Sequence, residues 1–205
     1  MRHLKPIIAA LFLISALTAG QAMATIISAS DTGLSAPGQT IGFEEVTLSN
    51  GPVTDQFLSL GVTFTPGVSY FNSISPRPNF SGPAVIDFFG ADISIQFSQA
   101  VTEVAAPMTA SFGSMSLTAL LDGVIVETLS YAFPNNTASS NLNNFFGFTN
   151  ILFDEVQLTP AGNTSVAMDN LSFTFAAAAV PEPGTLVLLG LGLAGIGLAR
   201  CKKKA

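Results

Sequence analysis

The central part of the chain alternates apolar and polar residues with a period of two, and this pattern limits the fold more than any other feature. The alternation is clean over residues 92–97, and residues 61–65 form a short run of β-branched and aromatic side chains. Asp122-Gly123 separates residues 115–121 from residues 124–133, which is a strong hairpin signal. Because successive side chains of a strand point to opposite faces, each run predicts a strand with one buried face.

Turn signals separate these runs at short intervals. Asn50-Gly51-Pro52 marks one turn, and residues 134–144 form a polar loop rich in Asn and Ser. No helical stripe of useful length precedes the C-terminal apolar run, and we find no internal repeat. Many short strands with close turns predict an all-β fold, a single antiparallel β-sandwich over residues 25–175. The chain has 17 phenylalanines to build its core, among them Phe173, which its alternation predicts to be buried.

The segment between residues 25 and 183 contains neither histidine nor cysteine, because His3 and Cys201 lie in the two end segments. This excludes Ser-His-Asp and Cys-His catalysis, zinc sites built from His or Cys, and disulfides. No dinucleotide-binding or P-loop glycine pattern is present. A carboxylate pair, as in glycoside hydrolysis, stays open, but the chain has no tryptophan and only 2 tyrosines to stack on sugars. We therefore expect a protein that is not an enzyme.

The same segment is strongly acidic. It holds all 13 acidic residues of the chain and a single basic one, Arg77, so its formal net charge is near −12. Nucleic-acid binding needs basic patches that neutralise phosphates, so this charge excludes nucleic acid as a partner. A cation such as calcium, or a neutral glycan, fits the charge.

Two carboxylates fall on the predicted core-facing side of strands. Asp169 has the same strand parity as the apolar Leu171, and Glu45 has the same parity as Phe43. A buried carboxylate is costly unless it is paired or ligates a metal, and Arg77 is the only base available. Calcium takes carboxylate and carbonyl oxygens, so Glu45 and Asp169 are candidate calcium ligands. The alternative is that both side chains lie beyond the sheet, in water or capping loop amides.

Residues 1–24 have the layout of a secretory signal peptide. Two basic residues precede an apolar stretch at 7–19, and Ala22 and Ala24 supply the small side chains that cleavage requires. Cleavage would leave Thr25 as the new N-terminus. An uncleaved N-terminal anchor is the alternative.

The other end of the chain combines a motif, an apolar run and a basic cluster. An Ala-rich linker at 176–183 ends in a Pro-Glu-Pro triplet, and a short transmembrane helix is expected at 184–199. The positive-inside rule places the basic tail at 200–205 in the cytoplasm and residues 25–175 outside the inner membrane. The basic residues of this tail are Arg200, Lys202, Lys203 and Lys204.

This tail resembles the PEP-CTERM sorting signal of Gram-negative bacteria that produce exopolysaccharide. The resemblance implies that exosortase, a membrane-embedded protease-transpeptidase, recognises the motif and cuts near it. Cys201 departs from the family pattern, which usually has more arginine at this place. The sorting-motif residues are Val180, Pro181, Glu182 and Pro183.

Several short motifs also resemble the jelly-roll domains, of galactose-binding or carbohydrate-binding-module type, that many PEP-CTERM proteins carry. They include residues 41–45, 60–64, 145–149 and 168–173. In related jelly rolls, acidic residues of the first and last strands hold a calcium ion, and the resemblance implies the same role for Glu45 and Asp169.

Together these features predict a non-catalytic exported protein of the cell surface or extracellular matrix. We expect it to be anchored in the inner membrane through its C-terminal helix, processed by an exosortase, and then associated with exopolysaccharide. A carbohydrate-binding module with defined glycan specificity is the alternative, followed by a carboxylate-dependent glycan hydrolase.

Overall fold

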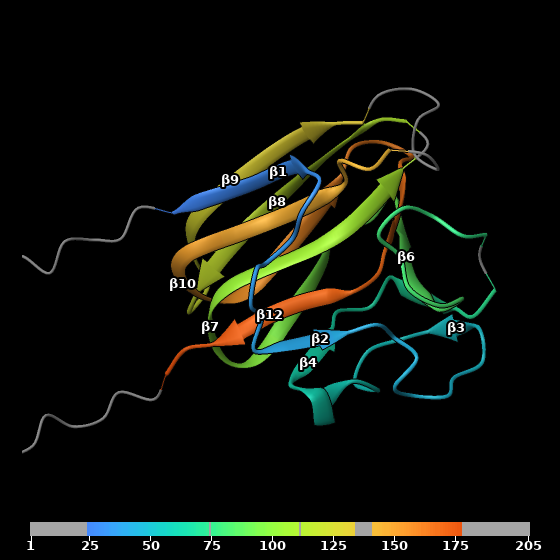
Figure 1. Ribbon diagram of the computed structural model, residues 1–205, viewed down its shortest axis with the longest axis horizontal. Helices are drawn as coiled ribbons and strands as arrows, with labels where there is room; N and C mark the ends of the chain where they lie inside the picture. Colours follow the sequence, from blue (N-terminus) through green and yellow to red (C-terminus); the bar gives the residue numbers. More distant parts are fainter. Residues whose placement is uncertain (1–23, 74, 111, 134–140, 178–205) are drawn as a thin grey trace, which may run out of the picture.

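The structure is a computed structural model that describes residues 24–73, 75–110, 112–133 and 141–177. These residues form twelve β-strands and one short 3₁₀ helix, η1 (Leu58–Leu60), which confirms the predicted all-β class (Figure 1). In chain order the strands are β1 (Thr25–Ser30), β2 (Gln39–Ile41), β3 (Gly51–Pro52), β4 (Val62–Phe64), β5 (Val68–Phe71), β6 (Val85–Phe89), β7 (Ile93–Ala110), β8 (Ser114–Leu121), β9 (Val124–Ala132), β10 (Phe145–Pro160), β11 (Ser165–Met168) and β12 (Leu171–Phe175).

Two long strands, β7 and β10, run through both layers of a β-sandwich. Residues 145–149 of β10 pair with one half of β7 and with β1, whereas residues 155–160 pair with β8 and the other half of β7. The register between β7 and β10 is broken between these halves, where both strands bend. The first layer is therefore β1-β10-β7-β12-β2, and the second is β9-β8-β10-β7-β4.

A further group of strands extends the sandwich at the far end of β7. Residues 108–110 of β7 pair with β11, and β11 continues through β6 and β5 to β3 at the edge. We call this group sheet B. In Figure 1 it lies on the side of the molecule opposite the two chain ends.

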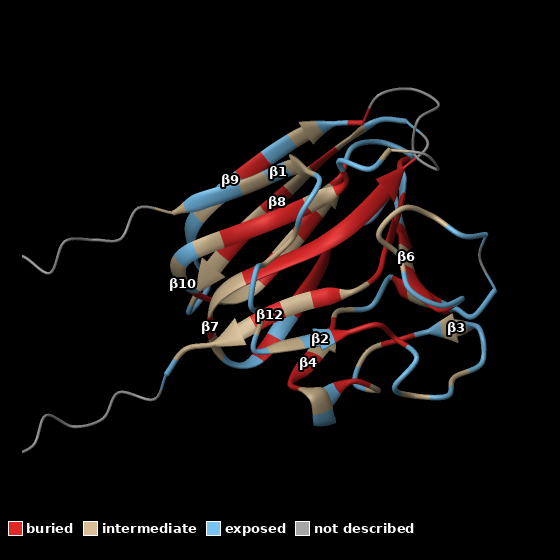
Figure 2. Cartoon of the chain, viewed as in Figure 1, coloured by how far each residue is buried: buried red, intermediate tan, exposed pale blue. Residues whose placement is uncertain are grey.

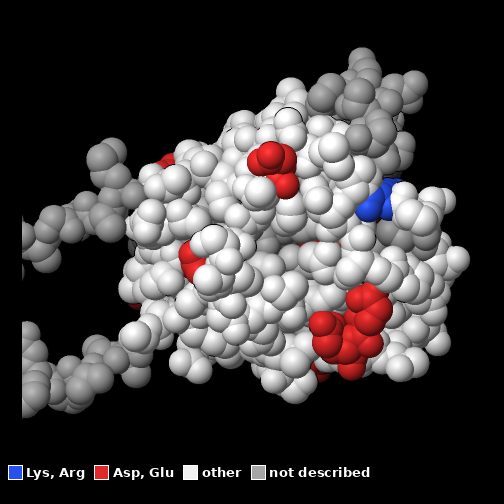
Figure 3. Space-filling model, viewed as in Figure 1, with Lys and Arg blue, Asp and Glu red and all other residues white. Residues whose placement is uncertain are grey.

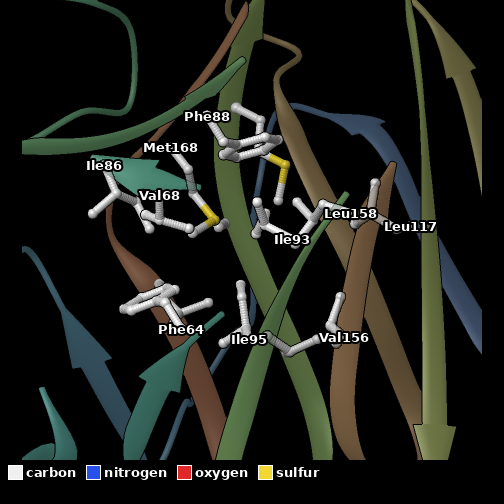
Figure 4. Packing of buried hydrophobic residues seen from close by; sticks show 14 of the residues in the cluster. Phe64, Val68, Ile86, Phe88, Ile93, Ile95, Leu117, Val156, Leu158 and Met168 are labelled. Carbon is white, nitrogen blue, oxygen red and sulfur yellow. The ribbon is translucent and has the colours of Figure 1, made fainter. Parts of the chain in front are cut away.

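Phenylalanine rings connect the two layers, as the sequence predicted. Phe173 in the first layer is fully buried, and its ring centroid lies 5.1 Å from that of Phe97. Phe97 also packs on Phe153, at 6.1 Å. Figure 2 shows the buried residues on the facing sides of the strands, and Figure 4 shows residues of several strands meeting in the core.

The predicted hairpin at Asp122-Gly123 is also confirmed. It joins β8 to β9, and both turn residues have left-handed backbone, with φ of 50° at Asp122 and 76° at Gly123. Two positive φ values are the requirement of the turn that matches the twist of a two-residue hairpin.

The described chain enters and leaves the sandwich at one place. Thr25 pairs with Thr149, Thr149 with Glu103, and Glu103 with Thr174, so these four residues form one row across β1, β10, β7 and β12. At a strand spacing of about 4.8 Å, Thr25 and Thr174 lie roughly 14 Å apart. Both grey traces in Figure 1 accordingly leave the same side of the molecule.

Within the described ranges, no helix is long and apolar enough to cross a membrane. Residues 1–23 of the predicted signal peptide and the predicted helix at 184–199 lie outside the described residues.

Replacing Phe173 with alanine should lower the free energy of unfolding by about 3–5 kcal/mol, because the substitution leaves a cavity between the two layers. Urea unfolding followed by circular dichroism measures the change. Phe112→Ala removes a ring that is 55% exposed and should have a much smaller effect. Equal losses in the two variants would contradict this role of Phe173.

Candidate functional site: an acidic corner

Asp169 is a fully buried carboxylate at the turn between β11 and β12. Its Oδ2 accepts a hydrogen bond of 2.6 Å from the backbone N–H of Ser81, and its Oδ1 accepts one of 2.6 Å from the N–H of Asn170. Ser81 belongs to the connection between β5 and β6, so the carboxylate fastens this distant segment to the start of β12.

Two more carboxylates come from the segment after β2. Glu44 Oε1 accepts a hydrogen bond from the N–H of Ala84 at 3.2 Å, and Glu45 Oε1 accepts one from the N–H of Gly42 at 2.9 Å. The carboxylate of Glu44 also fills the space above Gly82, where a Cβ would lie 2.0 Å from its Oε1. Figure 3 shows acidic atoms gathered over the segment that joins β2 to β3. We call Glu44, Glu45 and Asp169 the acidic corner.

Burial and like charge both act on Asp169. Loss of hydration raises its pKa from 3.8 to about 7, the two backbone N–H groups oppose this rise, and the charges of Glu44 and Glu45 add to it. The corner is therefore a region of negative potential around a carboxyl that holds a proton near neutral pH.

Side-chain amides continue the network beside the corner. Asn170 Oδ1 accepts a hydrogen bond from the Ser81 hydroxyl at 2.7 Å, and Asn170 Nδ2 donates to the carbonyl of Asn79 at 2.8 Å. Asn79 in turn donates to Asn144 Oδ1 at 2.7 Å. In the described part of the chain, no buried side-chain nitrogen or oxygen lacks a hydrogen-bond partner.

The structure treats the two predicted metal ligands differently. Asp169 is buried, as its strand parity predicted, and it caps loop amides, which was the alternative role considered. The prediction that Glu45 shares the core-facing side of Phe43 is wrong, because β2 ends at Ile41 and Phe43 has a φ of 66°, which breaks the alternation. Glu45 is exposed.

Glu44 belongs to the corner although its strand parity gave no sign of it. The one local signal for it is a pair of glycines, Gly42 and Gly82, which leave room for its carboxylate. Among the residues that the structure describes, no group of three or more His, Cys, Asp or Glu side chains is placed to hold a metal ion. The calcium ion predicted at Glu45 and Asp169 stays a prediction.

The predicted sorting motif (Val180 to Pro183) and basic tail (Arg200, Lys202 to Lys204) lie outside the described residues. The last described residue, Ala177, follows β12 by two positions. The motif therefore begins within a few residues of the row where the chain leaves the sandwich.

In the presence of a chelator, the free energy of unfolding should fall as the pH rises from about 4 to about 7. The reason is that folded Asp169, with a pKa of about 7, binds its proton more tightly than the unfolded chain, where the value is 3.8. Integrated over this interval, the loss from Asp169 is on the order of 4 kcal/mol. Urea unfolding at several pH values measures it.

The contribution of Asp169 is the difference between the profiles of the wild type and Asp169→Asn, because all other titrating groups are shared. Asp31→Asn, at an exposed position, is the matched control and should keep the wild-type slope. If Asp169→Asn has the same slope as the wild type, the carboxyl does not titrate as described.

Comparisons with known proteins agree with the tail and leave the sandwich without a close relative. No curated protein matches the chain. A DUF4465 family protein from Bacteroides caccae is similar in structure, with 9% identity, a TM-score of 0.37, and coverage of 75% of this chain and 100% of that one. A family 6 carbohydrate-binding module has 14% identity, a TM-score of 0.35, and coverage of 63% and 95%. Likenesses this weak carry no argument about function.

The PEP-CTERM protein-sorting motif matches residues 179–203, where the Pro-Glu-Pro triplet, the apolar run and the basic cluster lie. This confirms the resemblance that those residues suggested. The chain is thus an all-β protein with a PEP-CTERM sorting domain C-terminal to its sandwich.

Proposed function

We propose that this chain is a non-catalytic surface or extracellular-matrix protein that an exosortase-type enzyme processes at its tail and that then associates with exopolysaccharide. The sorting motif at 179–203 carries this proposal. A jelly-roll-like sandwich is the exported part, and the helix at 184–199 holds it at the inner membrane before processing.

The path of the chain supports display of the sandwich away from the membrane. The chain leaves the first layer beside Glu103, whereas sheet B pairs with β7 at Met108, Thr109 and Ala110. Seven strand residues separate Glu103 from Ala110, a distance of roughly 23 Å. A domain held at its exit row therefore presents sheet B outward, and processing at the motif needs no movement within the sandwich.

The chemistry of the described carboxylates supports a role without catalysis. Asp169 is fully buried and both of its oxygens accept backbone hydrogen bonds, so it is not presented to a substrate. The Glu44 and Glu45 carboxylates also accept backbone N–H groups. Capping of amides accounts for the positions of all three.

We also propose that a structural calcium ion binds at Glu45 and Asp169. Electrostatics support it, since both Glu44 and Glu45 raise the pKa of Asp169 and a divalent cation would relieve this repulsion. The donor atoms are of the right kind, because calcium takes carboxylate oxygens, and each of these oxygens keeps a lone pair after accepting one hydrogen bond.

A carbohydrate-binding function is the second candidate, and one observation favours it. Phe71 and Phe89 on sheet B are 39% and 59% exposed, whereas the phenylalanines between the layers are buried. Exposed aromatic rings were the feature that the sequence composition made scarce.

Replacing Pro181, Glu182 and Pro183 with alanine should stop processing, because the triplet is the part of the motif that the exosortase would read. Immunoblots of the native host should then show only the longer, membrane-bound precursor. Serine at Ala176, Ala177 and Ala178, just before the motif, is the matched control and should be processed normally. A wild-type pattern from the alanine variant would refute recognition of the triplet.

Calcium should raise the melting temperature of the protein more than magnesium at the same concentration and ionic strength. Binding to the folded state alone stabilises by about 2.7 kcal/mol when the ion is a hundredfold above its dissociation constant. Magnesium separates binding from screening, because it demands a tighter octahedral site.

The matched variants for this measurement are Asp169→Asn, which should remove the difference between the two ions, and Asp122→Asn at the β8–β9 turn, which should keep it. Equal shifts with calcium and magnesium in the wild type would show that the ions only screen charge.

A further inference from the structure

The outer face of sheet B carries side chains that the core does not use. Core residues alternate along its strands, and Figure 4 shows Val68, Ile86, Phe88 and Met168 pointing into the packed interior. The residues between them point outward. We call the outward set the β5–β6 face, and its members are Ser69, Phe71, Asp87, Phe89 and Ser165.

Strand register places these side chains in order. Ser69 lies opposite Asp87, and Ser165 lies opposite Phe89. Phe71 lies opposite Val85, four residues before Phe89 on β6, so the two rings are roughly 13 Å apart along the strands. Asp87 lies midway between them. The face is therefore a track with an aromatic ring at each end and polar groups in the middle.

The polar groups are arranged to accept and donate hydrogen bonds. The Ser165 hydroxyl donates to the Asp87 carboxylate, at 3.2 Å from Oδ1 and 3.0 Å from Oδ2. Partial burial raises the pKa of Asp87, while the Ser165 hydroxyl and the charge of Arg77 oppose the rise. Arg77 comes from the β5–β6 connection and donates to Thr109 Oγ1 on the same side of sheet B. Both oxygens of Asp87 keep lone pairs for further donors.

The rings at the ends of the track are not explained by folding. Exposure of Phe89 leaves apolar surface in water, which costs free energy unless a partner covers it. A partner that covers Phe71 and Phe89 and also meets Asp87 must present apolar faces and hydroxyl donors in alternation. Sugar rings do so, because their C–H groups and hydroxyls point in different directions.

Charge narrows the partner further. The segment from 25 to 183 has a formal net charge near −12, and the centre of the track is a carboxylate. An anionic polymer would be repelled from this face, whereas a neutral one would not.

We propose that the β5–β6 face binds a neutral, hydroxyl-rich glycan chain, with Phe71 and Phe89 stacking on separate sugar rings and Asp87 and Ser165 binding hydroxyls between them. The proposal rests on the proposed function in one respect, since it names the polymer class that the exported domain meets. The site lies on the part of the molecule that faces away from the exit row, where a long polymer has access.

The test is binding of the full-length chain, solubilised in detergent and immobilised, to soluble neutral glucan, galactan and mannan, with polygalacturonate as the anionic comparison. At least one neutral glycan should bind, and Phe89→Ala and Asp87→Asn should each weaken that binding at least tenfold. Ile125→Ala is the control for Phe89→Ala, because it removes a side chain of similar exposure, 64%, from β9. Asp31→Asn is the control for Asp87→Asn.

Three results would overturn the proposal: no binding of any neutral glycan, equal binding by wild type and both face variants, or equal loss in Ile125→Ala. Processing and surface exposure of Phe89→Ala in the native host are followed in parallel. Normal processing without glycan binding rejects the β5–β6 face alone. An unprocessed wild-type chain that binds glycan rejects the sorting function alone.

Discussion

The pairing of β7 with β10 is the contact on which the rest of the structure depends, because both strands cross from one layer of the sandwich to the other. Phe146 pairs with Ala106 in the first layer, and Val156 pairs with Ile95 in the second. The contact is so close that a Cβ at Gly147 would lie 1.9 Å from a carbonyl oxygen of β7. Since both layers contain the same two strands, neither can form its core without the other.

Local pattern was enough to predict the class of the fold and several of its strands. The alternation at 92–97 lies in β7, and Asp122-Gly123 makes the turn that two positive φ values require. The sequence did not reveal that β7 continues from Ile93 to Ala110, because the bend near residues 98–100 interrupts the alternation and Pro107 is unusual inside a strand. Long-range pairing with β10 and β12 holds this segment extended.

The acidic corner shows the same limit at the level of single residues. Strand parity correctly placed Asp169 in the interior, yet its partner Ser81 lies 88 positions away in sequence, and no local signal links them. Parity failed for Glu45, because the left-handed backbone at Phe43 ends the two-residue period on which the argument rested. Glu44 was missed since its place is defined by the space above Gly82 rather than by a strand.

An acidic domain with a single arginine cannot stabilise its interior carboxylate with an ion pair, so backbone amides take that part. Amides supply hydrogen bonds but not a full positive charge, and for this reason Asp169 still has a raised pKa. The corner therefore gains from either a proton or a cation. Because β7 separates the exit row from sheet B, neither change at the corner nor cleavage at the motif requires the β5–β6 face to move. Sorting and polymer contact can then depend on different residues of one rigid sandwich.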